Sequence, residues 1–198
     1  MANLSDIQID ALKEMGNIGS GNAATALSQL ICEVVRINVP AVKVLPLNQV
    51  PDTLGGPEKV VFAVYLEVLS KMQGTMLTTF SEESAMLLVG KLLGGPDTDI
   101  DSEISQSALK ELGSILCGSY LSALSQVVGM SSIASVPAIT YDMLGAVLDF
   151  ILIEIGQVAE EVLIIETELF VADEKLECTQ IFLPKPEALE MILSSLGM

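Results

Sequence analysis

Residues 9–31 read IDALKEMGNIGSGNAATALSQLI, and residues 106–128 read QSALKELGSILCGSYLSALSQVV. Eleven of the 23 aligned positions are identical, and every aligned pair is 97 residues apart. This spacing is much longer than the ~20–50 residues of a solenoid repeat. The sequence therefore predicts a duplicated domain with internal two-fold pseudosymmetry, in which a functional surface can occur twice.

The segments that follow the two copies have the same order. Each half is expected to hold a long helix, then strands, then a closing helix. The expected elements of the first half are a helix over 4–35, strands over 40–47, 60–69 and 74–80, and a helix over 84–93. Those of the second half are a helix over 104–128, strands over 137–143, 162–171 and 176–183, and a helix over 186–196. The apolar run at 147–155 is ambiguous, and we interpret it as a strand.

These elements predict an α/β layer fold with a largely antiparallel sheet and the two repeated helices side by side on one face. We expect a single domain over 1–198, made of repeats 1–96 and 103–198. The polar, acidic stretch 97–102 is the expected linker. We expect a monomer, because the duplication supplies the symmetry that a single-copy relative would obtain by dimerising.

The composition limits where the protein works. Hydrophobic residues make up 51% of the chain but aromatic residues only 4%, with no tryptophan, so the core must be aliphatic. No uncharged apolar run reaches the ~18 residues of a membrane span, and no signal peptide is recognisable at the N-terminus. The three cysteines are odd in number and widely spaced, which favours reduced, buried thiols. We therefore expect a cytoplasmic protein with no membrane partner.

The charge and the missing residue types exclude several kinds of function. A net charge of −17 argues against nucleic-acid binding and disfavours anionic membranes. Because the chain has no histidine, Ser-His-Asp and Cys-His catalytic groups cannot form in it. No GxxxxGK[ST] loop occurs, and a zinc site would need three distant cysteines to converge. We expect no cofactor and no metal site in this chain.

The first copy of the repeat has a polar ridge opposite its core side. At ~100° per residue, the residues that fall on the core side are Ile9, Leu12, Met15, Gly16, Ala23, Ala26, Leu27 and Leu30. The ridge residues lie within about 40° of one another on the other side: Asp10, Glu14, Asn17 and Gly21. The apolar residues beside this first ridge are Ile7, Ala11 and Ile18.

The second copy reproduces this surface. Its ridge consists of Ser107, Glu111 and Ser114, and its apolar flank consists of Ile104, Ala108 and Ile115. A polar ridge with apolar borders is what protein docking needs, although solvated surface residues can give the same pattern. The glycines at 16, 19 and 21 each cost ~1 kcal/mol of helix propensity relative to alanine. That cost indicates a close approach of another helix or of a partner.

Asp10, Glu14 and Asn17, followed by Pro40, closely resemble the signature of the CheC/CheX/FliY family of chemotaxis phosphatases. The second copy has the corresponding proline at Pro137. A doubled pattern in a chain that ends near residue 198 is similar to the CheC branch, because CheX has one pattern and FliY carries an additional C-terminal domain. The resemblance covers essentially the whole chain.

The resemblance implies that the chain removes the phosphoryl group from the phospho-aspartate of the response regulator CheY. Glu14 would engage the regulator's active-site lysine, and Asn17 would orient the attacking water. Asp10, Ser107, Pro40 and Pro137 would support the two motifs. Mg²⁺ is expected in the regulator's own acidic pocket. An acyl phosphate is already activated, so positioning a water is a sufficient task for the helper protein.

The second site departs from the family pattern, because Ser114 stands where asparagine is expected. A serine hydroxyl is shorter by about one bond than the asparagine amide and is held less firmly. We predict that this site is weak or inactive, while Glu111 can still dock a regulator. The alternative is that Ser114 orients the water through a second, bridging water.

The same resemblance implies a second function of another class. Relatives in the CheC branch are also implied to bind and regulate CheD, a glutamine deamidase that modifies receptors. In that interpretation the chain is mainly an adaptor, as a monomer or as a heterodimer with CheD, and it uses a surface away from the ridges. Substitutions in the ridge would separate the two functions.

Overall fold

The two copies of the repeat form two helices of 26 residues each, α1 (Asp6–Ile31) and α4 (Glu103–Val128). The computed structural model describes residues 5–69, 71–95, 99–155 and 161–195. Ser5 and Ser102 are the N-caps of the two helices, and both helices end at a left-handed residue, Cys32 or Gly129. α1 therefore ends four residues before the predicted boundary at Val35.

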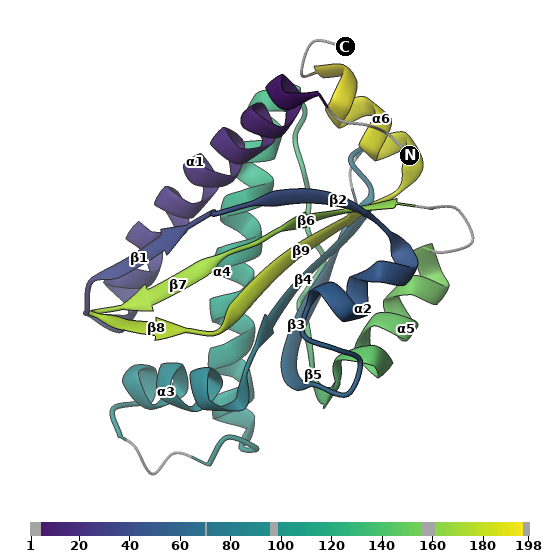
Figure 1. Ribbon diagram of the computed structural model, residues 1–198. Helices are drawn as coiled ribbons and strands as arrows, with labels where there is room; N and C mark the ends of the chain where they lie inside the picture. Colours follow the sequence, from purple (N-terminus) through teal and green to yellow (C-terminus); the bar gives the residue numbers. More distant parts are fainter. Residues whose placement is uncertain (1–4, 70, 96–98, 156–160, 196–198) are drawn as a thin grey trace.

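Six antiparallel strands form the main sheet in the order β2-β6-β9-β4-β3-β5 (Figure 1). The bounds are β2 Val42–Pro46, β3 Val60–Val68, β4 Gly74–Phe80, β5 Ala138–Met143, β6 Glu161–Ile165 and β9 Cys178–Pro184. The prediction of a mixed α/β fold with an antiparallel sheet is confirmed. A smaller antiparallel sheet pairs β1 (Val35–Asn38), β7 (Glu168–Val171) and β8 (Glu174–Leu176).

The centre of the main sheet lies between β4 and β9, where Leu77 is opposite Ile181. Next to β4 lies β3 and then the edge strand β5, and next to β9 lies β6 and then the edge strand β2. The strands at equal distance from the centre are therefore the ones that correspond in the two repeats: β4 with β9, β3 with β6, and β5 with β2. A two-fold axis through the centre would produce this order. It supports the division into repeats 1–96 and 103–198, which stays a prediction. Residue 96 at the end of the first repeat and residues 97 and 98 of the linker lie outside the described residues.

Two predicted strands are wrong in detail. The strand expected over 162–171 is two strands, because the chain changes partners at Glu166: β6 pairs with β2 and β9, whereas β7 pairs with β1 and β8. The run at 147–155 is not a strand but belongs to the helix α5 (Leu144–Ile155). Its buried residues are Leu144, Val147, Leu148 and Ile151, a helical spacing of three and four that a strand would not produce.

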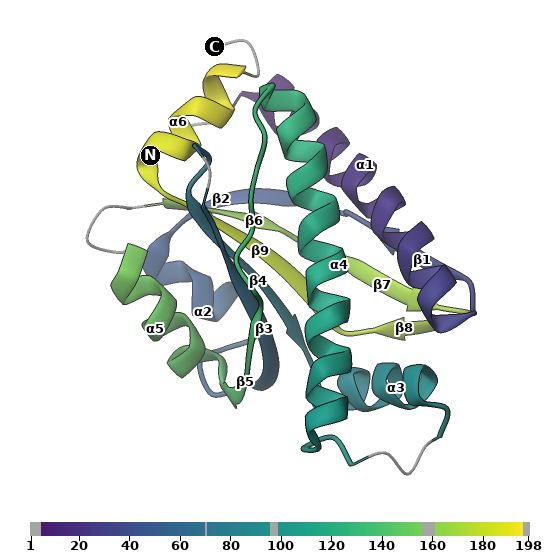
Figure 2. The same ribbon diagram turned by 180° about the vertical axis from the view of Figure 1, so that it is seen from behind.

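The helices form a layer on each face of the sheet and cover its ends. α1 and α4 lie side by side on one face (Figure 2). The other face carries α5 and the short helices η1 (Leu47–Gln49) and α2 (Val50–Thr53) (Figure 1). Near the two ends of α4 lie α3 (Glu82–Leu93) and α6 (Pro186–Ser195). None of the described helices is long and apolar enough to cross a membrane.

α1 and α4 run antiparallel and come very close at one point. The early residues of α1, such as Leu12, share a core cluster with the late residues of α4, such as Leu124. Conversely, Leu27 of α1 clusters with Leu112 of α4. A Cβ built on Gly19 would lie 3.1 Å from the Cα of Tyr120. The glycine at 19 therefore permits the helices to cross with their backbones almost in contact.

Candidate functional site: two polar ridges on a helix pair

The first ridge is exposed along its whole length: Asp10, Glu14, Asn17 and Gly21 all lie on the outer surface of α1. On the opposite side of the helix, Leu12, Met15, Ala23 and Leu27 are buried. The helical periodicity thus placed the ridge correctly. Leu30, which was assigned to the core side, is 41% exposed because Ile31 occupies the buried position in that turn.

The apolar flank of the first ridge is also at the surface. Ile7 is 76% exposed and Ile18 is 42% exposed, while Ala11 is half-buried. By helical geometry the three apolar residues lie on one side of the ridge, next to Glu14, so a protein docked on this face would cover apolar and polar groups together. The structure therefore brings together the residues that the sequence assigned to docking and to chemistry.

The second ridge is less open than the first. Ser107 and Glu111 are exposed, but Ser114 is half-buried. On its flank, Ile104 is 62% exposed, whereas Ala108 and Ile115 are half-buried and Ile115 packs against the core. The serine that replaces asparagine thus lies lower on the helix surface and has a shorter reach.

The ridge side chains have no partners among the described residues. In the part of the chain that the structure describes, no hydrogen bond or ion pair is made by the side chains of Asp10, Glu14, Asn17, Ser107, Glu111 and Ser114. Glu14 and Asn17 are three residues apart, so they are neighbours one turn apart on the helix surface. Their carboxylate and amide are free to bind groups of another molecule.

The two ridges lie at opposite ends of the helix pair. Glu14 precedes the crossing at Gly19, and Glu111 precedes the crossing at Tyr120 on the antiparallel helix. At 1.5 Å per residue, the two glutamates are about 20 Å apart along the helices. Neither ridge can therefore complete the other, and each must work with its own residues.

The prolines of the two motifs each precede an edge strand of the main sheet. Pro40 is exposed just before β2, and Pro137 is half-buried just before β5. A Cβ built on Gly16 would lie 3.1 Å from Cγ1 of Val39, the residue before Pro40. The glycine and the proline segment of the first repeat thus pack together under the ridge.

A buried polar contact behind the first ridge was not predicted. The hydroxyl groups of Ser20 and Tyr120 are 2.8 Å apart, and Tyr120 Oη is 3.4 Å from Thr167 Oγ1. Burial raises the pKa of Tyr120, which keeps the phenol protonated. This contact ties α1 to α4 one turn beyond Asn17. Its residues differ between the two copies of the repeat, which is the sequence signal that could have indicated an asymmetric contact.

The three cysteines are free thiols, and two of them are buried. Burial raises the pKa of Cys117 to about 11 and also raises the pKa of Cys178. The described residues hold no group of three or more His, Cys, Asp or Glu side chains that could bind a metal ion.

The buried thiols predict a loss of stability in alkaline solution. Unfolding returns Cys117 to its ordinary pKa, so above about pH 9 the unfolded chain loses its proton first. We expect the free energy of unfolding to be full below that pH and to fall by about 2–3 kcal/mol as the pH rises to about 11. Urea unfolding at about pH 8 and about pH 10.5 measures it. Cys117→Ala should weaken the pH dependence, whereas Cys32→Ser, at an exposed position, should leave it unchanged.

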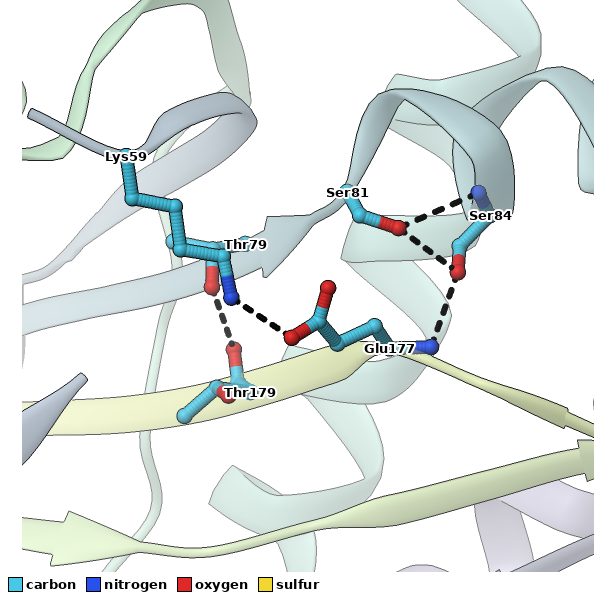
Figure 3. Close-up of polar contacts among 6 residues, drawn as sticks. All are labelled: Lys59, Thr79, Ser81, Ser84, Glu177 and Thr179. Atoms are coloured by element: carbon cyan, nitrogen blue, oxygen red, sulfur yellow. Dashed lines mark hydrogen bonds and ion pairs between the residues drawn. The ribbon is translucent and has the colours of Figure 1, made fainter. Parts of the chain in front are cut away.

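On the opposite face of the sheet lies a cleft of about 370 Å³ whose charged residues pair with one another. Lys59 Nζ is 2.7 Å from Glu177 Oε1, and the Glu177 amide donates to Ser84 Oγ at 2.8 Å (Figure 3). Lys175 Nζ is 2.5 Å from Glu168 Oε1. Because these lysines and glutamates are paired with one another, the cleft has fewer charged groups available to bind a ligand than the ridges have.

The sequence and the fold are both similar to those of known proteins. Residues 7–44 match the model of the CheC-like family. The CheY-P phosphatase CheC of Bacillus subtilis is 34% identical over 200 residues, covering 98% of this chain and 96% of the relative. The structure of Thermotoga maritima FliY superposes with a TM-score of 0.76 at 19% identity, with 98% of each chain covered.

A further solved structure shares the fold at greater distance. The CheX–CheY–BeF3–Mg²⁺ complex from Borrelia burgdorferi gives a TM-score of 0.53 at 17% identity, covering 84% of this chain and 96% of that one. The family match falls on α1 and its ridge, and the Bacillus relative extends the likeness along nearly the whole chain. This chain therefore belongs to the CheC-like family.

Proposed function

We propose that this protein is an aspartyl-phosphate phosphatase that dephosphorylates CheY, with Glu14 and Asn17 as its working pair. The observation that carries the proposal is the exposed, unpartnered pair on α1, one turn apart. A relative named CheY-P phosphatase supports the activity, and a fold neighbour solved with CheY supports the partner.

The chemistry of the two groups suits this task. The amide of Asn17 can accept and donate a hydrogen bond at once, so it can orient a water for in-line attack on phosphorus. The carboxylate of Glu14 can form a charge-assisted hydrogen bond to a lysine of CheY and so fix the partner. Mg²⁺, held by the acidic pocket of CheY, would supply charge neutralisation at the phosphoryl group.

We further propose that the second site is weak or inactive in hydrolysis. Ser114 is half-buried and has a shorter side chain than asparagine, so its hydroxyl reaches less far toward a docked phosphoryl group. Glu111 is exposed and unpartnered like Glu14, so docking can persist there. If Ser114 works through a bridging water, the second site retains measurable activity.

The decay of phosphorylated CheY tests these assignments. Catalytic amounts of the wild-type protein should accelerate decay, and Glu14→Ala/Asn17→Ala should remove the acceleration. Glu111→Ala/Ser114→Ala should leave most of it. The side chains of all four residues make no hydrogen bond or ion pair in the described part of the chain, so both double variants should unfold like the wild type. Wild-type protein that leaves the decay rate unchanged would refute the phosphatase proposal.

A second candidate function is the binding and regulation of CheD. The favouring observation is an apolar surface on the side of the sheet away from the ridges, where Phe150 is 55% and Ile153 is 69% exposed on α5. The ring of Phe150 lies near that of Tyr65 on β3, with 6.2 Å between the ring centroids. A protein docked on α5 would leave both ridges open. This proposal places the protein in the cytoplasm, as a monomer or as a heterodimer with CheD.

The same double variants separate the two candidates. Binding of CheD, measured by calorimetry, should survive Glu14→Ala/Asn17→Ala and should weaken in Phe150→Ser, a substitution at an exposed position. Loss of CheD binding in the ridge variant would show that the two functions share one surface.

A further inference from the structure

The side chains of three lysines have no partner among the residues that the structure describes, although the protein is strongly acidic. The chain has nine basic residues against 26 acidic ones. Six of the nine bind an acidic or amide side chain: Arg36, Lys43, Lys59, Lys91, Lys175 and Lys185. Within the described ranges, the other three make no ion pair or hydrogen bond: Lys13, Lys71 and Lys110.

Two of these three free lysines occupy the same position in the two copies of the repeat. Lys13 and Lys110 are 97 residues apart and precede Glu14 and Glu111. Lys13 lies four residues before Asn17, so the two side chains are neighbours on one face of α1. Asp10 lies one turn away on the other side, yet Lys13 forms no ion pair with it.

The partial burial of Lys13 is consistent with an ammonium group at the edge of the first ridge. Lys13 and Lys110 are half-buried, whereas Lys71, in the turn between β3 and β4, is exposed. A lysine in such a position lays its aliphatic stem along the helix and keeps its ammonium group at the surface. The ammonium of Lys13 is therefore available beside the Asn17 amide.

A phosphoryl group needs such a cation on this surface. The group is an anion, and docking it on the first ridge brings it close to Glu14 and Asp10 on a protein with a net charge of −17. Like charges at an interface slow association and weaken binding. A free ammonium one turn from the water-orienting amide would offset that repulsion where it is largest.

We propose that Lys13 is a docking residue that attracts and holds the anionic, phosphoryl-bearing face of the regulator beside Asn17. The inference rests on the proposed phosphatase function and adds a determinant of partner affinity to it. Lys110 is the corresponding group at the second ridge, where Ser114 replaces the asparagine. Lys13 contacts the partner and takes no part in proton transfer.

Steady-state kinetics with phosphorylated CheY test this proposal. Lys13→Gln should raise KM about five-fold at about 0.03 M salt and leave kcat within about two-fold, because a charge at the edge of an interface acts on association. The difference should shrink at about 0.3 M salt, where screening is stronger. Lys13→Arg keeps the charge and should restore most of the affinity.

The third free lysine provides a matched control. Lys71→Gln removes the same charge from the protein at a distant turn, so it should leave KM unchanged at both salt concentrations. Lys110→Gln should also leave KM unchanged if the first site carries the turnover. A Lys13→Gln effect no larger than that of Lys71→Gln, or equal to that of Lys110→Gln, would overturn the assignment.

Binding distinguishes this inference from the function on which it rests. Calorimetry with CheY carrying BeF3⁻ and Mg²⁺, where BeF3⁻ stands in for the phosphoryl group, reports affinity without turnover. Weaker binding by Lys13→Gln than by Lys71→Gln supports the docking role even if hydrolysis is absent. If wild type hydrolyses phosphorylated CheY and both variants bind alike, the phosphatase proposal stands and the role of Lys13 is refuted.

Discussion

Exchanging the asparagine and the serine between the two ridges is expected to move phosphatase activity from the first site to the second. Asn17→Ser should lower the acceleration of phospho-CheY decay by about 100-fold, since a misplacement of about 1 Å at a reacting group costs that much. Adding Ser114→Asn should restore part of the activity, because Glu111 is already exposed in the matching position.

The exchange carries its own controls. The side chain of Asn17 is exposed and makes no hydrogen bond within the described ranges, so Asn17→Ser should unfold at the wild-type temperature. Glu111→Ala added to the exchanged protein should remove the regained activity, whereas Glu14→Ala should not. Full activity in Asn17→Ser alone would mean that a serine can orient the water, and Ser114 would then mark a working site.

Gly113→Ala is expected to destabilise the protein by about 2 kcal/mol, in the range that overpacking of a well-filled core costs. A Cβ built on Gly113 would lie 2.5 Å from Cγ1 and 2.7 Å from Cβ of Val64. Val64 is fully buried on β3 and its branched side chain has little rotational freedom. The helix or the strand must therefore shift. Urea unfolding at neutral pH measures the loss.

Gly118→Ala is the matched control on the same helix. A Cβ at Gly118 meets nothing within 4 Å, so this substitution should stabilise the protein by up to about 1 kcal/mol through helix propensity. Gly16→Ala should fall between the two, because its nearest atom is 3.1 Å away on Val39. Equal stability of Gly113→Ala and Gly118→Ala would show that α4 packs more loosely on β3 than the structure indicates.

The sequence predicted the elements whose periodicity is regular. Helix α4 and the strands β3, β4 and β9 agree with the predicted ranges within about two residues, the usual uncertainty of such boundaries, whereas α1 ends four residues early, at Ile31. The helix α5 was missed because its apolar residues occur in a nearly continuous run, which hides the spacing of three and four. The break between β6 and β7 depends on which strands lie alongside, and that is decided by the tertiary structure.

The exposed positions of the ridges were also predictable, because a polar side in a helix follows from residue spacing alone. The contacts beneath them were not. The Ser20–Tyr120 hydrogen bond joins residues 100 positions apart, and no local pattern indicates such a pair. The sequence also could not predict that Lys13 forms no ion pair with the described residues, because this depends on which acidic side chains the fold brings near each lysine.

The crossing of α1 and α4 has a consequence for how such a surface can change over evolutionary time. At the position equivalent to Ser20 the second helix has Cys117, and at the position equivalent to Tyr120 the first helix has Ala23. The Ser20–Tyr120 bond is therefore made once. In an assembly of identical subunits, every substitution would appear on both sides of the axis together. A single chain that carries both helices lets one copy specialise while the other keeps its chemistry.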